Sequence, residues 1–135
     1  MQLSVYLFIY GRCEEAMKFY QSILGGDLEI QHVGDSPAAE QMPKDWHGKV
    51  MHSTLHGDGF DIMASDGSPD WHQEKESNIS LTIGTSDEAK ARDIFGKLSA
   101  GGNVTMPLEK MFWGALFGQV TDKYGFDWMI NCVTG

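Results

Sequence analysis

One pattern of residue types occurs twice in this chain. In each copy an apolar, β-branched segment is followed by acidic residues and an alanine, then by one or two aromatic residues, and then by a pair of glycines. The first copy runs from Val5 to Gly26, and the second, roughly 76 residues later, runs from Ile79 to Gly102. The duplication predicts two strand-helix-turn-strand modules with pseudo-twofold symmetry. Modules of this kind leave a concave sheet surface, where small ligands bind.

The first half of the chain has the pattern of a strand, a helix and three more strands. Apolar and β-branched runs predict the strands, and apolar residues at helical spacing after Glu14 predict the helix. Gly57-Asp58-Gly59 predicts a tight hairpin, because glycine tolerates the positive φ of such turns. In chain order we expect a strand at 3–10, a helix ending at residue 24, a strand at 28–33, a long mobile connection at 34–49, and strands at 50–56 and 60–64.

The second half repeats this order. We expect a helix capped by Thr85 or Ser86 and ended by Gly101-Gly102. The strands are expected at 79–83, 104–108, 115–121 and 128–133. Together the halves predict an α+β fold of paired βαβββ modules, with module one at about 1–66 and module two at about 77–135. At 135 residues the chain is expected to form a single domain, 1–135.

Composition argues against several classes of partner. The formal charge is −9, from 19 acidic and 10 basic side chains, so binding to a phosphate backbone is disfavoured and no nucleic acid is expected. Cys13 and Cys132 fit no metal-finger or redox spacing. The apolar start of the chain is too short to span a membrane and lacks the features of a signal peptide. We therefore expect a cytoplasmic protein with no membrane partner.

Several short motifs follow one another across the whole chain. They are Tyr6-Leu7-Phe8, Glu15-Ala16 with Phe19-Tyr20, Val50-Met51-His52, Met63-Ala64-Ser65-Asp66, and Phe112-Trp113-Gly114 with Phe117-Gly118, Asp122, Gly125 and Trp128. In this order the chain resembles the PhnB-like branch of the glyoxalase/bleomycin-resistance/extradiol-dioxygenase superfamily, also called vicinal oxygen chelate proteins. The resemblance implies that the two modules curl a mixed sheet into a central cup. It also implies a homodimer.

The resemblance further implies where a metal would be bound. Superfamily enzymes that use metal place one His or Glu ligand on each of four strands. In this chain those positions fall at Val5 or Tyr6, at Ser65 or Asp66, at Asn78, and at Met129. Only Asp66 is a good ligand, whereas a divalent metal needs several imidazole or carboxylate donors. We therefore expect no metal and no other cofactor.

His52 and Asp66 are the candidate catalytic residues. An imidazole in an apolar strand can act as an acid or base near neutral pH, and the predicted hairpin brings the neighbourhood of Asp66 opposite His52. The alternatives are a core histidine that is hydrogen-bonded to a neighbour, and an aspartate that merely begins a turn. Cys13 follows Arg12 at a helix start, where the dipole and a cation lower a thiol pKa, but no base is spaced to complete a nucleophile.

The candidate substrate-binding residues come from both modules. Aromatic residues beside Gly114 and Gly118 can form a lid or a pocket wall, or else pack at a sheet edge or dimer interface. In the last strand Trp128 is expected to lie under a helix, and Met129 is expected to face the cup. The complete set of candidates is Tyr6, Ser65, Asn78, Trp113, Phe117 and Met129.

These residues favour a protein that binds a small polar molecule in its cup without the usual metal. One alternative is a metal-dependent lyase, isomerase or dioxygenase of the same superfamily, with ligands such as His52 and Asp66. Another is a resistance protein that sequesters a drug. A methyltransferase is not supported, because no glycine-rich loop follows the first strand with an acidic residue downstream.

Overall fold

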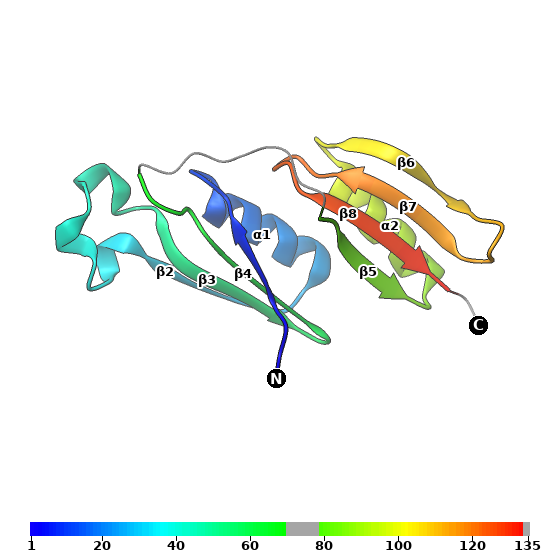
Figure 1. Ribbon diagram of the computed structural model, residues 1–135, viewed down its shortest axis with the longest axis horizontal. Helices are drawn as coiled ribbons and strands as arrows, with labels where there is room; N and C mark the ends of the chain where they lie inside the picture. Colours follow the sequence, from blue (N-terminus) through cyan, green and yellow to red (C-terminus); the bar gives the residue numbers. More distant parts are fainter. Residues whose placement is uncertain (70–78, 134–135) are drawn as a thin grey trace. The chain divides into compact units, whose positions relative to one another are not determined.

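The chain forms two compact units, seen in the computed structural model of Figure 1. The N-terminal unit spans Met1–Glu74 and the C-terminal unit spans Lys75–Gly135. The structure describes residues 1–69 and 79–133. Within this part of the chain each unit contains one α-helix and one four-stranded sheet.

The N-terminal unit has the order strand, helix and three strands. Its sheet order is β1-β4-β3-β2, in which β1 and β4 are parallel and the other neighbours are antiparallel. The hairpin between β3 and β4 turns at Gly59, whose φ of 83° is left-handed, as expected for a glycine turn. The elements are β1 (Val5–Phe8), α1 (Cys13–Leu24), β2 (Asp27–His32), β3 (Val50–Gly57) and β4 (Phe60–Ser65).

The C-terminal unit repeats the same topology. Its sheet order is β5-β8-β7-β6, with β5 parallel to β8 and the other pairs antiparallel. The predicted α+β fold of paired βαβββ modules is therefore confirmed. The elements are β5 (Leu81–Thr85), α2 (Glu88–Ser99), β6 (Asn103–Lys110), β7 (Leu116–Thr121) and β8 (Asp127–Cys132).

In each unit the helix packs on one face of the sheet and creates the core. Tyr20 of α1 is fully buried, as is Leu55 of β3, and the Cys13 Sγ lies 3.7 Å from the Ser53 Oγ. On the sheet of the C-terminal unit, a Cβ added to Gly118 would lie 2.8 Å from the Phe95 ring, so α2 rests closely on β7. Residues between these buried positions point to the opposite face, because side chains alternate along a strand.

We call this opposite face of the N-terminal sheet its open face. Strand register aligns its members in rows: Tyr6 with Met63 and Thr54, and His56 with Asp61 and Asp27. The open face of the C-terminal sheet is defined in the same way by Thr82, Met106, Phe117, Gln119, Met129 and Asn131. In β8 the burial alternates: Trp128 is buried and Met129 is half-buried, so these two neighbours face opposite sides of the sheet.

The connection between β2 and β3 is built from short helical turns. The segment 33–46, which overlaps the long mobile connection predicted at 34–49, contains three 3₁₀ turns, η1 (Val33–Asp35), η2 (Ala39–Gln41) and η3 (Lys44–Trp46). Val33 and Trp46 are buried, and the Lys49 ammonium donates a hydrogen bond to the Gly11 carbonyl at 3.2 Å. Among the described residues no helix has both the length and the apolar character needed to cross a membrane.

Candidate functional site

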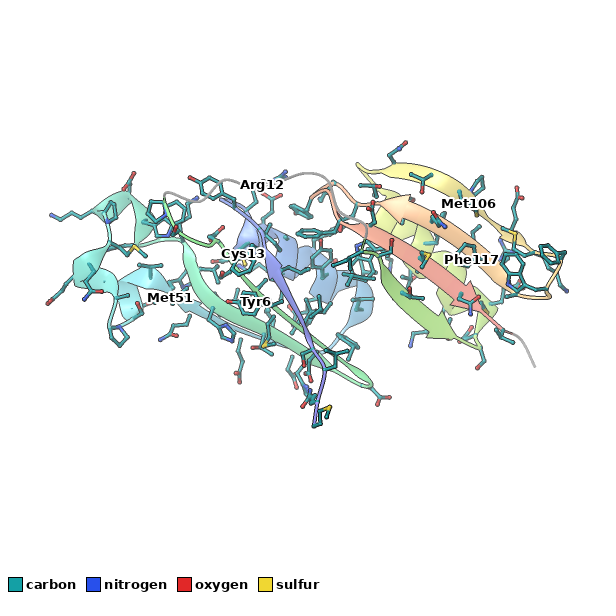
Figure 2. All side chains as sticks on the ribbon, in the orientation of Figure 1. Tyr6, Arg12, Cys13, Met51, Met106 and Phe117 are labelled. Carbon is teal, nitrogen blue, oxygen red and sulfur yellow. The ribbon has the colours of Figure 1, made fainter. Side chains whose placement is uncertain are left out.

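A cluster of His52, Tyr6 and Thr54 lies on the open face of the N-terminal sheet. The Tyr6 hydroxyl is 3.3 Å from the His52 Nδ1, and the Thr54 hydroxyl is 3.2 Å from the Nε2. The Tyr6 ring lies 5.7 Å from the imidazole and 5.1 Å from the Phe8 ring, measured between centroids. Figure 2 shows Tyr6 on β1 in this unit. We call these four residues the Tyr6–His52 cluster.

The hydrogen bonds of this cluster define what it can do chemically. A neutral imidazole donates at one nitrogen and accepts at the other, so one hydroxyl donates to His52 and the other accepts from it. Because a hydroxyl can donate and accept at once, Tyr6 keeps hydrogen-bonding capacity for a further molecule. His52 itself is exposed, so the alternative of a core histidine is wrong, although its bonds to neighbours are present.

Asp66 lies in a different environment from His52. Its side chain is buried, and one carboxylate oxygen accepts a hydrogen bond from the Cys13 amide at 3.0 Å. The other oxygen accepts from the Val50 amide at 2.7 Å. The structure therefore does not join Asp66 to His52, and the predicted acid/base pair is not formed. The carboxylate instead connects the first turn of α1 to the start of β3.

The other predicted residues of the N-terminal unit have distinct positions. Ser65 pairs in register with Phe8 of β1, and its buried hydroxyl accepts a hydrogen bond from the Gly67 amide at 3.2 Å. It is Ser65, rather than Asp66, whose side chain begins this turn. The candidate Asn78, which belongs to the C-terminal unit, lies outside the described residues. Of the predicted N-terminal candidates, the structure thus brings together only Tyr6 and His52.

In the C-terminal unit the aromatic candidates gather at the hairpin between β6 and β7. The Trp113 ring meets the Phe117 ring edge-on, with centroids 5.9 Å apart, and the Phe112 ring lies 4.9 Å from Trp113. Phe112 is 98% exposed and Trp113 is 55% exposed. Figure 2 labels Phe117 on β7. Met129 lies on the open face of the same sheet, in register with Gln119.

The positions that the resemblance gives for a metal do not fit one. Val5 and Met129 carry no imidazole or carboxylate, and both oxygens of Asp66 are hydrogen-bonded to backbone amides. In residues 1–69 and 79–133 no group of three or more His, Cys, Asp or Glu side chains could hold a metal ion. Zn, Ni and Fe sites in proteins use several such donors.

Two features were not expected from the sequence. Burial raises the pKa of the Cys13 thiol to about 12, so the expected lowering by Arg12 and the helix start is wrong. The Nδ1 of His56 is hydrogen-bonded to the Asp61 carboxylate across the β3–β4 hairpin, a pair that was not predicted. The signal was present, because residues equally spaced from a tight turn face each other in a hairpin.

A family model and a curated relative each match nearly the whole chain. A family model described as 3-demethylubiquinone-9 3-methyltransferase matches residues 2–131. Protein YjdN of Escherichia coli (strain K12) is 33% identical over 142 residues, which cover 98% of this chain and 96% of the relative.

Several solved structures are similar to this chain over nearly its whole length. Protein PA1353 from Pseudomonas aeruginosa is 40% identical, with a TM-score of 0.90 over 100% of this chain and 99% of that chain. A PhnB protein from Bacillus cereus is 25% identical, with a TM-score of 0.80 over 98% and 100%. A glyoxalase/bleomycin resistance protein/dioxygenase family enzyme from Burkholderia phytofirmans PsJN, 11% identical, has a TM-score of 0.60 over 96% of each chain, which shows the fold alone.

The paired βαβββ units therefore have the fold of the glyoxalase/bleomycin-resistance superfamily. The chain belongs to the family whose model is described as 3-demethylubiquinone-9 3-methyltransferase, a description that the PhnB protein from Bacillus cereus shares. Membership fixes the fold and the ancestry of the chain, whereas its chemistry has to be argued from the site.

Proposed function

We propose that this protein binds a small, planar, polar organic molecule on the open face of its N-terminal sheet, and does so without a metal. The observation that carries the proposal is the Tyr6–His52 cluster: an exposed imidazole with a hydroxyl at each ring nitrogen, the Tyr6 ring beside it, and the Phe8 ring beside Tyr6.

Aromatic surface and directional hydrogen bonds are both available at this cluster. Tyr6 is 38% exposed and Phe8 is 48% exposed, although both are large side chains that folding usually buries. Flat rings favour a flat partner through stacked or edge-on contacts. The tyrosine hydroxyl, with its donor and acceptor capacity, would then orient a hydroxyl or carbonyl group of the ligand. Ligand sites commonly combine apolar walls with a few placed polar groups.

Methyl transfer, which the family description names, finds no support in these residues. Classical methyltransferases bind their cofactor at a glycine-rich turn of a doubly wound parallel sheet. Both sheets described here are mixed, and β1 leads into α1 through a segment with Gly11 as its one glycine. A metal-dependent lyase, isomerase or dioxygenase would need ligands that the four inferred positions do not supply. Metal content and thermal shifts with Zn, Ni, Mn and Fe(II) ions test that alternative directly.

Binding can be tested with a planar probe and a non-planar control. We expect catechol to shift the side-chain NMR signals of His52 and Tyr6 in a saturable way. Cyclohexane-1,2-diol, with the same two hydroxyls but no flat ring, should shift them much less. Equal responses to the two probes, or responses elsewhere only, would contradict the proposal.

His52→Gln separates a binding role from a structural one. Because His52 is exposed, the variant should keep nearly the same melting temperature while losing most of its catechol binding. A large loss of stability with catechol binding intact would contradict a binding role for His52.

The aromatic candidates of the C-terminal unit need a separate readout. If Trp113 contacts the ligand, its fluorescence should change on saturation with catechol, and Trp113→Phe should remove that change. An invariant spectrum would favour an interface role instead.

We also propose that the protein is a cytoplasmic homodimer, and sedimentation equilibrium measures the oligomeric state.

A further inference from the structure

A groove with a volume of ≈ 310 Å³ lies at the hairpin end of the N-terminal unit. Its walls include Gln2 and Leu3, which precede β1, together with His56, Phe60 and Asp61 of the β3–β4 hairpin. Figure 1 shows the first residues of the chain running past the tip of this hairpin. None of these residues belongs to the Tyr6–His52 cluster, so the groove is independent of the function proposed above.

An imidazole held by a carboxylate lines this groove. The Asp61 Oδ1 is hydrogen-bonded to the Nδ1 of His56, and the Asp61 Oδ2 accepts a hydrogen bond from the Gln2 side-chain amide at 2.5 Å. Both carboxylate oxygens therefore have partners. Within residues 1–69 and 79–133 the Nε2 of His56 has none, and the side chain is 69% exposed. In the His56–Asp61 pair, this nitrogen is the polar group that can still form a hydrogen bond with another molecule.

The charges around His56 favour the protonated form of its imidazole. The hydrogen bond and the charge of Asp61 raise the pKa of His56 above its ordinary value of 6.5, and Asp27 on the adjacent strand β2 adds to the effect. His56 in turn lowers the pKa of Asp61 below 3.8. Near neutral pH a larger share of His56 is thus protonated than in an isolated histidine, with an N–H donor at Nε2. From the N-terminal segment the facing side chain is the uncharged Gln2.

These charges select among the possible partners of that donor. The carboxylates of Asp27 and Asp61 disfavour an anion near the Nε2. A cation such as an ammonium group has no lone pair and cannot accept the hydrogen bond that the protonated Nε2 donates. A neutral acceptor, such as the oxygen of an amide or ketone, meets neither penalty. Its apolar part has Leu3, which is 98% exposed, and Phe60 to contact.

We propose that this groove is a second binding site, which takes a small neutral amide or ketone through a hydrogen bond from the His56 Nε2 to the carbonyl oxygen. The site needs the protonated imidazole. Above the pKa of His56 the neutral imidazole keeps its one proton on Nδ1, where it is donated to Asp61. The Nε2 then becomes an acceptor and no longer donates to a carbonyl.

Three probes that share a phenyl ring but differ in the charge of its substituent test the proposal on the full chain. We expect acetanilide, which is neutral, to shift the His56 Nε2 signal saturably in NMR spectra at pH 6. Benzoate and benzylammonium at the same concentration should shift it less. Raising the pH to 9 should weaken acetanilide binding about tenfold, as expected for losing a charged hydrogen-bond donor. Tighter binding of benzylammonium, or no change with pH, would overturn the proposal.

Variants separate this site from the Tyr6–His52 cluster. His56→Ala should abolish the acetanilide shifts around the hairpin, and a melting curve checks that the variant is folded. His52→Gln should leave those shifts in place even where catechol binding is lost. Asp61→Asn should lower the pKa of His56 and move the pH at which acetanilide binding is lost to a lower value. Unchanged acetanilide binding in folded His56→Ala would refute the site.

Discussion

At the scale of single residues, burial decides the reactivity of the cysteines. Cys13 is fully buried, and burial, opposed in part by the hydrogen bond with Ser53, raises its pKa from 9.0 to about 12. The fraction of thiolate at a given pH is then about 1000-fold smaller than for a thiol with the unshifted pKa. Cys132 is also buried, with 1% of its surface exposed.

We therefore expect neither cysteine to react with Ellman's reagent in the folded protein at pH 8. Two thiols should react rapidly after addition of guanidinium chloride, which serves as the control. Stoichiometric labelling of the native protein within seconds would contradict the burial of both side chains.

The buried carboxylate of Asp66 gives a second prediction at this scale. Asp66→Asn replaces one acceptor oxygen by an amide group, which then faces a backbone N–H. Losing a charged hydrogen bond and leaving a donor unsatisfied should lower the free energy of unfolding by about 2–3 kcal/mol. Urea denaturation measures this change. Asp45→Asn, at an exposed position, is the matched control and should change stability by less than about 0.5 kcal/mol. Equal stability of the two variants would mean that Asp66 is not structural.

The sequence could indicate some of these residues but not their partners. Tyr6 was predicted from the position that the family resemblance gives on the first strand, and His52 from its place in an apolar strand. The bonds of Asp66 could not be predicted, because its partners, Cys13 and Val50, are 53 and 16 positions away along the chain. Only the packing of α1 on the sheet brings the first of these amides to the carboxylate.

At the scale of elements, the two helices begin in different ways. Helix α2 is capped by Asp87, whose side chain accepts a hydrogen bond from the Lys90 amide at 3.1 Å. The predicted caps Thr85 and Ser86 are therefore wrong, although the Thr85 hydroxyl accepts from the Asp87 amide. Helix α1 has no side-chain cap at Arg12 and receives Asp66 from the end of β4 instead.

Asp87→Ala should lower the free energy of unfolding by about 1 kcal/mol, the usual cost of removing such a cap. Ser86→Ala, at the neighbouring exposed position, should have almost no effect. Urea denaturation of both variants tests which residue is the cap. A larger loss in Ser86→Ala would show that the sequence prediction was correct after all.

Element types were easier to predict than their bounds. The period of apolar residues predicted both helices and every strand, because each element buries one face. The strand expected at 79–83 is instead β5 at Leu81–Thr85, since pairing with β8, rather than local pattern, sets where the ladder begins. The turns η1 to η3 were missed because single 3₁₀ turns have no periodicity and depend on tertiary contacts such as the burial of Trp46.

At the scale of the whole molecule, the internal duplication was the strongest signal in the sequence. Repeating one module predicts that both copies have the same strand order, and the two sheets do. What duplication does not predict is chemistry. The exposed imidazole cluster occurs in the N-terminal unit, whereas the exposed aromatic pair of Phe112 and Trp113 occurs in the C-terminal unit. The copies have kept the topology while their open faces have diverged.

The prediction of a single domain can be tested by the cooperativity of unfolding. Units of the size of Met1–Glu74 and Lys75–Gly135 bury only about 60% of their unfolded surface on folding, which is marginal for independent stability. We therefore expect one calorimetric transition, with equal calorimetric and van't Hoff enthalpies. Asp66→Asn alters the N-terminal unit and Asp87→Ala alters the C-terminal unit. In a single cooperative domain both variants lower the temperature of the same transition, whereas two resolved transitions, each moved by only one variant, would show two independent domains.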